Sequence, residues 1–236
     1  MNLEELSKDI QSKCTRCVLS LSGGLDSTTL AYLLVHALGK DNVAAVSFNY
    51  NQRHDVELQM AKKSAEKLGI RYMLIDISGI SNELAENTGL IKTSKIKIPS
   101  INEILGDPQP QNIYVPYRNM LMSTYLFIFA EHWKFDSVSI GIQTIDEYHF
   151  WDCTSSFVDS INKVSELNRK FNIQLITPIS TMSKRDIVVL GKELNVPFED
   201  TWTCYNPKIK GIFKKKYEPC NVCPSCSIRN QAIQGK

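Results

Sequence analysis

A short polar loop at residues 22–27 carries the residue types that bind phosphate. It reads Ser-Gly-Gly-Leu-Asp-Ser and directly follows the apolar run Cys-Val-Leu-Ser-Leu at residues 17–21. The stretch 28–38, which follows the loop, has the spacing of a helix. Because glycine has no Cβ, the backbone N–H groups of Gly23 and Gly24 can approach phosphate oxygens closely, and the start of a helix adds partial positive charge. A strand, this loop and a helix in that order predict an anion-binding cradle.

The side chains of the loop add hydroxyl donors and one carboxylate. Ser22 and Ser27 can donate to phosphate, and Asp26 suits a Mg²⁺ ion that bridges phosphates. The Gly-x-x-x-x-Gly-Lys-Ser/Thr pattern of a Walker A loop is absent. The loop resembles instead the pyrophosphate loop of the ATP pyrophosphatases. A plain turn capped by serine or aspartate is the simpler alternative, and we weigh it lower because of the flanking strand and helix. The residues expected to bind ATP are Leu21, Ser22, Gly23, Gly24, Leu25, Asp26 and Ser27.

Four of the seven cysteines have the spacing of a structural metal site. Cys220, Cys223 and Cys226 are three residues apart, so they can place three sulfurs on one tight turn, and Cys204 can supply the fourth ligand. Four ligands leave no open position, which predicts a structural zinc ion. Free or disulfide-bonded cysteines are the less favoured alternative, and an iron–sulfur cluster uses the same four-cysteine ligation.

The remaining cysteines and the lysines between the ligands have simpler interpretations. Cys14 and Cys17 form a second Cys-x-x-Cys pair that lacks a partner pair, so we interpret it as incidental. We expect a solvated loop rather than an RNA contact at the lysines, because aromatic residues do not interleave with them convincingly as a stacking platform. These lysines are Lys208, Lys210, Lys214, Lys215 and Lys216.

Composition limits the class of protein. The chain has 236 residues, 43% of them hydrophobic, and a net charge of +2, which gives no global field for nucleic acid or an anionic membrane. The longest apolar run, near residues 120–130, is too short to span a bilayer. Residues 1–12 are acidic and polar and lack the features of a signal peptide. Together with the seven cysteines, this favours a reducing, cytoplasmic location and metal binding before disulfides.

Apolar runs that alternate with amphipathic stretches predict an α/β fold with a parallel sheet covered by helices on both faces. Strands are expected near residues 16–21, 43–48, 71–77, 137–142 and 173–176. Helices are expected near residues 27–38, 55–68, 118–133, 154–169 and 183–194. Residues 78–113 lack a clear period, so we expect an active-site excursion or lid there. We place a boundary between an α/β domain at 1–200 and a zinc-binding subdomain at 201–236.

Several further stretches, taken in order with the loop and the cysteines, resemble the 7-cyano-7-deazaguanine synthase family, QueC, nearly end to end. They read Phe-Asn-Tyr-Asn-Gln-Arg-His-x-x-Glu at 48–57, Tyr-Val-Pro-Tyr-Arg-Asn at 114–119, Asp-Cys at 152–153, Ser-Lys-Arg-Asp-Ile-Val at 183–188 and Thr-Trp-Thr-Cys-Tyr at 201–205. The resemblance implies an adenine-nucleotide α-hydrolase-like fold with a C-terminal zinc subdomain, ATP, Mg²⁺ and Zn²⁺ as cofactors, and a homodimer. The implied reaction converts 7-carboxy-7-deazaguanine and ammonia to the 7-cyano compound. We therefore expect the protein to act on small molecules, and we expect neither a membrane partner nor direct contact with nucleic acid.

Three cations are candidates for neutralising phosphates and the charge that develops in the reaction, together with Asp26 as a catalytic residue. Arg53 and Arg118 are each expected at a helix start, where the dipole disfavours a cation unless an anion is bound. Lys184 is also expected in a first helical turn, although Ser183 and Asp186 beside it could form only a capping box. His54 is as well explained by packing as by a role as a base.

The loop after the strand that ends near Gly141 should face the ligand crevice at the carboxyl edge of the sheet. Asp146 and Asp152 are therefore candidate substrate residues, and Asp152 could bind the guanidine-like edge of a deazapurine. We interpret Cys153 as packing rather than as a nucleophile, because no base is identifiable.

One stretch departs from the family. Chains of this family usually carry Ser-Gly-Tyr-Pro before Asp-Cys, whereas residues 148–151 read Tyr148-His149-Phe150-Trp151. We expect Phe150 or Trp151 to form one wall of the heterocycle pocket. The change leaves open a related enzyme that passes the adenylated carboxylate to another amine, including that of a protein partner. A tRNA thiolase would normally need a catalytic cysteine pair or an appended RNA-binding domain, and neither is apparent. The intact loop argues against a non-catalytic nucleotide-binding protein.

Overall fold

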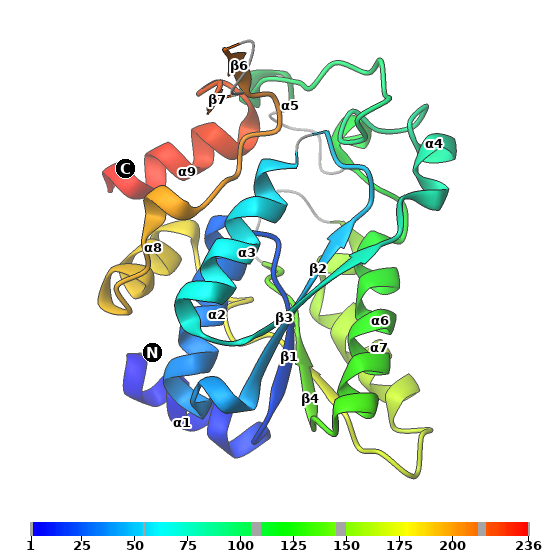
Figure 1. Ribbon diagram of the computed structural model, residues 1–236, viewed down its shortest axis with the longest axis vertical. Coiled ribbons are helices and arrows are strands. Elements are labelled where there is room, and N and C mark those ends of the chain that lie inside the picture. Colours follow the sequence, from blue (N-terminus) through cyan, green and yellow to red (C-terminus); the bar gives the residue numbers. More distant parts are fainter. Residues whose placement is uncertain (1, 54, 105–109, 145–149, 212–215, 236) are drawn as a thin grey trace.

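The computed structural model describes residues 2–53, 55–104, 110–144, 150–211 and 216–235, and over these ranges the chain forms a five-stranded parallel sheet (Figure 1). The strand order is β3-β2-β1-β4-β5, so the order reverses between β1 and β4. The strands are β1 (Cys17–Ser20), β2 (Val43–Asn49), β3 (Arg71–Asp76), β4 (Ser137–Ser139) and β5 (Gln174–Ile176). This confirms the predicted parallel sheet, and each strand overlaps its predicted range.

Helices connect and cover these strands. The predicted helices correspond to α2 (Leu25–Leu38), α3 (Val56–Leu68), α6 (Arg118–Trp133), α7 (Ser155–Ser165) and α8 (Lys184–Glu193). Glycine ends α3, because Gly69 adopts the left-handed conformation (φ 66°) that most residues avoid. The ends of these helices lie within a few residues of the predicted ends, because residues such as Gly69 and the spacing of apolar residues mark them in the sequence.

The two faces of the sheet have separate apolar cores. Successive strand residues point to opposite faces, so Cys17 and Leu19 pack on one side of β1 while Val18 packs on the other. The first core includes residues of α2, α3, α8 and the N-terminal helix α1 (Leu3–Lys13), and the second includes residues of α6 and α7 (Figure 1). Helices on both faces are thereby confirmed.

A third apolar cluster joins the predicted excursion to the C-terminal cysteines. Residues 78–113 contain the short helices α4 (Ser81–Leu84) and α5 (Ile101–Ile104). Apolar residues of the segment 78–113, among them Leu90 and Ile113, pack with Cys204, Cys223 and Cys226. Figure 1 shows this part of the chain at the end of the molecule to which the arrow of β2 points. The excursion and the cysteine segment therefore share one core above the carboxyl edge of the sheet.

Outside the excursion, two α-helices and two strands of the described residues have no counterpart in the predictions. They are α1, the helix α9 (Pro224–Gln234) and the antiparallel strands β6 (Lys208–Lys210) and β7 (Lys216–Glu218). α1 begins with a capping box between Asn2 and Glu5, and α9 begins with Pro224 at its first turn; both are signals that the sequence carries. Ala232 of α9 packs into the first core. The division at residues 200 and 201 stays a prediction.

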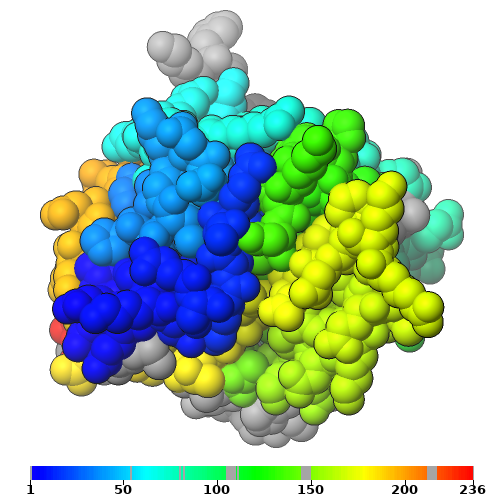
Figure 2. All heavy atoms as spheres, turned by 90° about the horizontal axis from the view of Figure 1, so that it is seen from below, coloured from blue at the N-terminus to red at the C-terminus, as the bar shows by residue number. Residues whose placement is uncertain are grey.

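A search of the described helices for a membrane span found none with the required length and apolarity. Figure 2, a view from below Figure 1, shows the end where the N-terminal residues lie, away from the C-terminal cysteine segment.

Candidate active site

A cavity of about 340 Å³ lies where the carboxyl ends of β1, β2 and β4 meet the C-terminal segment. Ser20 and Leu21 line it from the end of β1, Phe48 from β2, and residues 140–143 from the chain after β4. This position, at the reversal of strand order between β1 and β4, is where open α/β sheets bind ligands. Its volume is in the range of small-molecule sites.

The glycine-rich loop forms one part of the cavity and its backbone requires glycine. Gly23 has a φ of +78°, and a Cβ placed there would lie 2.2 Å from the carbonyl oxygen of Glu57 and 2.7 Å from the amide nitrogen of Ala61. The loop is therefore packed against the first turns of α3. From the other side, the amide of Trp202 donates to the carbonyl oxygen of Gly23 at 2.8 Å. A helix and the C-terminal segment together fix the loop.

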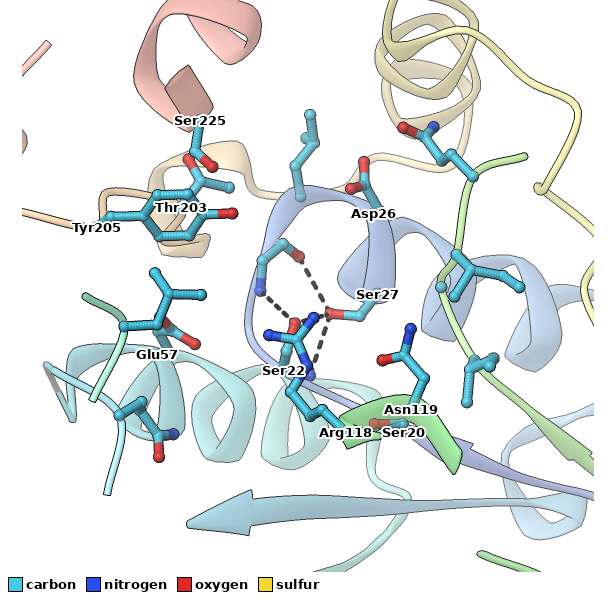
Figure 3. A pocket seen from close by; sticks show the side chains of 18 of the residues that line it. Ser20, Ser22, Asp26, Ser27, Glu57, Arg118, Asn119, Thr203, Tyr205 and Ser225 are labelled. Carbon is cyan, nitrogen blue, oxygen red and sulfur yellow. Dashed lines mark hydrogen bonds between the residues drawn. The ribbon is translucent and has the colours of Figure 1, made fainter. Parts of the chain in front are cut away.

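The two serines of the loop are linked to each other. Their hydroxyl oxygens lie 2.9 Å apart, and the amide of Ser22 donates to Ser27 Oγ at 3.1 Å (Figure 3). Gly24 is the N-cap of α2 and supplies no side-chain cap. The first turn of α2 thus leaves its N–H groups open to an anion, as the sequence predicts for phosphate.

Asp26 and Lys184 form an ion pair at the mouth of the loop. Lys184 Nζ lies 2.7 Å from Asp26 Oδ2, and both side chains are about one-fifth to one-quarter exposed, at 21% and 24%. Lys184 begins α8, and Ser183 and Asp186 form the capping box that was considered as its alternative explanation, so both features are present. The second oxygen, Asp26 Oδ1, is buried and accepts no hydrogen bond from the described residues. An unpaired carboxylate oxygen fits a hard cation such as Mg²⁺.

A second carboxylate, Glu57, lines the cavity on another side of the loop. In Figure 3 it lies near Tyr205, with Thr203 and Ser225 on the same side, whereas Asp26 lies on the other. Burial raises the pKa of Glu57 to about 7, against the opposing effect of the Arg118 guanidinium. Glu57 ends the stretch 48–57 that carries the family resemblance, but no role was predicted for it. Its place in the first turn of a helix that follows β2 was a further signal, since that edge of the sheet holds ligands.

Arg118 lines the cavity, and its charge lowers the pKa of Glu57 against the effect of burial. It is the first residue of α6, as predicted, and its guanidinium carbon lies 6.0 Å from the ring centre of Tyr50. Burial opposes its charge, but the ionisable groups around it raise the pKa of Arg118 overall; the strongest is Tyr50, followed by Tyr205, Cys153 and Asp152. Arg118 is therefore a fixed positive charge inside the cavity.

Arg53 has a different setting from the one predicted. It does not begin a helix, because α3 begins at Val56. Instead its amide donates to the carbonyl oxygen of Leu90 at 2.8 Å, beside a bridge between Gln52 and Ile91. The extended backbone here pairs with the excursion, which removes the helix-dipole argument for a bound anion. Arg53 is not among the residues that line the cavity.

The loop before α7 is described only from residue 150 onward. Asp146, Tyr148 and His149 lie outside the described residues, as do His54, Lys214 and Lys215. Phe150 lines the cavity and stacks on Tyr114 with ring centres 5.3 Å apart. Trp151 is not among the lining residues; it is 39% exposed and donates from Nε1 to the Tyr114 hydroxyl at 2.8 Å.

Asp152 and Cys153 meet the start of α6. Asp152 is 3% exposed, and its Oδ2 accepts from the amide of Asn119 at 3.2 Å, which is the arrangement of a helix cap. Asp152 is not among the residues that line the cavity, so its substrate role stays a prediction. Cys153 does line the cavity, and the Asn119 side-chain amide donates to its sulfur at 3.2 Å.

The four predicted metal ligands come together. The sulfurs of Cys204, Cys220, Cys223 and Cys226 all lie within 4.8 Å of one another, close enough to hold one metal ion. The amides of Cys220 and Cys223 donate to the sulfurs of Cys204 and Cys220 at 3.2 and 3.3 Å. The Cys204 thiol donates to Cys223, which raises the pKa of Cys204 and lowers that of Cys223. Cys14 and Cys17 lie elsewhere, buried in the first core.

Solved structures share the fold at low sequence identity. NMN synthetase from Francisella tularensis matches with a TM-score of 0.51 and 20% identity over 87% of this chain and 76% of that one. The U34-tRNA thiolase NcsA from Methanococcus maripaludis, solved with its [4Fe-4S] cluster, matches with a TM-score of 0.50 and 15% identity over 98% and 71%.

Sequence relatives match over nearly the whole chain. The 7-cyano-7-deazaguanine synthase of Leptospira interrogans serogroup Icterohaemorrhagiae serovar copenhageni (strain Fiocruz L1-130) is 35% identical over 99% of this chain and 93% of its own length. The enzyme of the same name from Marinomonas sp. (strain MWYL1) is 33% identical over 94% and 95%. The family described as queuosine biosynthesis protein QueC matches residues 16–236. The chain belongs to the QueC family.

Proposed function

We propose that this protein converts 7-carboxy-7-deazaguanine and ammonia to 7-cyano-7-deazaguanine with ATP, as a ligase of queuosine-type biosynthesis. The observation that carries the proposal is one cavity of about 340 Å³ that is lined by both the phosphate-binding loop and the half-buried Arg118. Membership of the QueC family supports the same reaction.

The chemistry requires the oxygens of a carboxylate to become leaving groups. The substrate carboxylate attacks the α-phosphorus of ATP, and pyrophosphate leaves. Ammonia then attacks the acyl carbon and displaces AMP, which gives the amide. A second adenylation, on the amide oxygen, lets that oxygen leave with AMP while the nitrogen loses its protons and forms the nitrile. The protein supplies positioning and stabilisation of charge.

Residues of the cavity suit these tasks. The open amides of the loop 22–27 and the hydroxyls of Ser22 and Ser27 bind the pyrophosphate. Lys184, which is held by Asp26 at 2.7 Å, neutralises negative charge as pyrophosphate leaves. Arg118, a half-buried cation in the same cavity, orients the substrate carboxylate toward the α-phosphorus. Arg53 lacks this support, and we assign it no step.

Two metals fit the residues present. Asp26 Oδ1 is the unpaired acceptor that would hold Mg²⁺, which neutralises phosphate charge when bound. The four clustered cysteines would hold one Zn²⁺ per chain as a structural ion, because no ligand position is left open. We also propose a homodimer and a cytoplasmic location, which light scattering of the purified protein and fractionation of cells can test.

The experiment is a single incubation of the zinc-loaded protein with 7-carboxy-7-deazaguanine, ATP, Mg²⁺ and ¹⁵N-ammonium. We expect AMP, pyrophosphate and a nitrile that carries one ¹⁵N, measured by mass spectrometry. Omission of ammonium is the control, and it should stop nitrile formation. Transfer of the acyl group to a different amine, or turnover without nitrile, would contradict the proposal.

A further inference from the structure

The side of the cavity that holds Glu57 has the composition of a heterocycle-binding wall. Four apolar or aromatic residues that line the same cavity as Glu57 belong to the third apolar cluster: Leu90, Ile113, Phe150 and Tyr205. Tyr205 lies on the Glu57 side in Figure 3, together with the hydroxyl residues Thr203 and Ser225. A planar ring gains from such walls, while its polar edge needs a partner of matching hydrogen-bonding type.

The Glu57 carboxylate is available for that edge. None of the hydrogen bonds or ion pairs found among the described residues uses its side chain, although it is partly buried and lines the cavity. The Arg118 guanidinium from α6 acts on Glu57 and opposes the effect of burial. Glu57 in turn contributes to the raised pKa of Tyr50, from the segment after β2, and of Tyr205, from the C-terminal segment. Burial raises its pKa to about 7, so a ligand that donates hydrogen bonds would favour the ionised form.

We propose that Glu57 determines specificity by binding the amino-pyrimidinone edge of the substrate, accepting one hydrogen bond from the ring N1–H and one from the 2-amino group. This inference rests on the proposed function. An ionised carboxylate has two acceptor oxygens and no donor, and this edge of a guanine-type ring offers two adjacent donors.

The direction of the ring follows from the neighbours of Glu57. The 7-carboxylate lies on the five-membered ring, away from the 2-amino group. Arg118 is the cation that acts on Glu57, and it lines the same cavity as Ser22 of the phosphate-binding loop. With the amino edge on Glu57, the carboxylate extends toward Arg118 and the loop, where the α-phosphorus must be attacked.

This assignment takes the place that the sequence suggested for Asp152. The carboxylate of Asp152 is 3% exposed and accepts from the amide of Asn119, so it is occupied as a helix cap. Glu57 has neither constraint. The two acidic residues therefore differ in what they are free to bind.

The test replaces a hydrogen-bond acceptor of the protein with a donor, and it replaces the matching donor of the substrate with an acceptor. Glu57→Gln keeps the size of the side chain but replaces one acceptor with a donor. The matching substrate is 7-carboxy-7-deazaxanthine, whose 2-oxo group accepts where the 2-amino group donates. We expect the wild type to prefer the 2-amino substrate by at least about 1,000-fold in kcat/KM, and the variant to prefer the 2-oxo substrate. The KM for ATP should change less than about threefold, since the nucleotide lies on the loop.

The control is Glu66→Gln, the same substitution on the same helix at an exposed residue. It should leave the preference unchanged. A Glu57→Gln variant that makes nitrile and still prefers the 2-amino substrate overturns the inference and leaves the proposed function intact.

A binding measurement separates the two proposals completely. Calorimetry of 7-deazaguanine and 7-deazaxanthine with wild type and variant needs no turnover, so it reports on Glu57 even if no nitrile forms. We expect the wild type to bind the 2-amino ring at least about tenfold more tightly. Equal affinity of the wild type for the two rings overturns the inference without any reference to the variant or its folding.

Discussion

Two carboxylates, Asp26 and Glu57, line the same cavity on different sides of the glycine-rich loop, and their surroundings differ. Asp26 is paired with Lys184 at 2.7 Å, and the free protein already balances its charge. Glu57 forms no ion pair with the described residues, and burial raises its pKa to about 7. One side of the cavity is therefore prepared for the phosphate chemistry, while we propose that donors on the ligand complete the other.

The largest effect is expected on the Asp26 side. Asp26→Asn removes the negative charge that pairs with Lys184 and that would hold a cation through its second oxygen. The rate of pyrophosphate release should therefore fall at least about 1,000-fold, which corresponds to several kcal/mol of transition-state stabilisation. Release under saturating ATP and Mg²⁺ is the measurement. The exposed Asp159→Asn serves as control, and a wild-type rate in Asp26→Asn would reject this role.

The next largest effect concerns the support of the Glu57 side. Cys223→Ser should lose the metal and lower the melting temperature, because the third apolar cluster that includes Phe150 and Tyr205 is built around the cysteines. Metal content by mass spectrometry and thermal unfolding are the measurements. Cys14→Ser should keep one zinc per chain. Iron in place of zinc, or a well-folded preparation without metal, would contradict the assignment.

A third prediction uses the raised pKa of Glu57. Below about pH 4.5 the carboxyl is protonated in the native and unfolded chains alike; between 4.5 and about 7 only the native chain holds the proton. Native stability from this group is therefore lost as pH rises through that window. The amide side chain of the Glu57→Gln variant cannot titrate, so the variant lacks this loss. The free energy of unfolding of the variant minus that of the wild type should therefore increase by an amount on the order of 1 to 3 kcal/mol from low pH to pH 7.

Urea unfolding of both proteins across this window measures that difference. It should reach a plateau above about pH 8, where native and unfolded carboxyls are both ionised. Glu66→Gln should run parallel to the wild type. A constant difference between Glu57→Gln and wild type would show that Glu57 does not titrate abnormally.

The smallest effect should separate two adjacent aromatic residues. Phe150→Ala removes a side chain that lines the cavity, so the KM for the deazapurine should rise by an amount on the order of 1–3 kcal/mol in free energy, while the KM for ATP changes less. Trp151→Ala should leave both KM values within about twofold, because Trp151 contacts Tyr114 and lies outside the lining. Equal shifts in the two variants would reject the distinction.

The fold was predictable wherever periodicity or a helix terminator was present. The five strands and the helices between them follow from runs such as residues 17–21 and from glycines such as Gly69. α9 was missed because its polar sequence has no clear apolar stripe, and its start is signalled mainly by Pro224. The predicted family membership is confirmed.

The candidate site was predictable where its residues lie close together in the sequence. The loop 22–27 and the four cysteines were found by spacing, and their geometry follows from short segments. The surroundings of Asp152 were not predictable, because the sequence does not show that its carboxylate meets the start of α6. That contact is made by the amide of Asn119, which is 33 residues away along the chain. The substrate role of Asp152 stays a prediction.

The hydrogen bond from Trp202 to Gly23 also bears on the order in which this protein becomes active during synthesis. The phosphate-binding loop leaves the ribosome early, but the group that fastens it comes from a segment made near the end. A nascent chain that has completed its sheet still lacks the hydrogen bond from Trp202 to the loop, and it also lacks the C-terminal cysteines. The loop therefore gains this hydrogen bond only after the segment around Trp202 has been synthesised and has packed against Gly23.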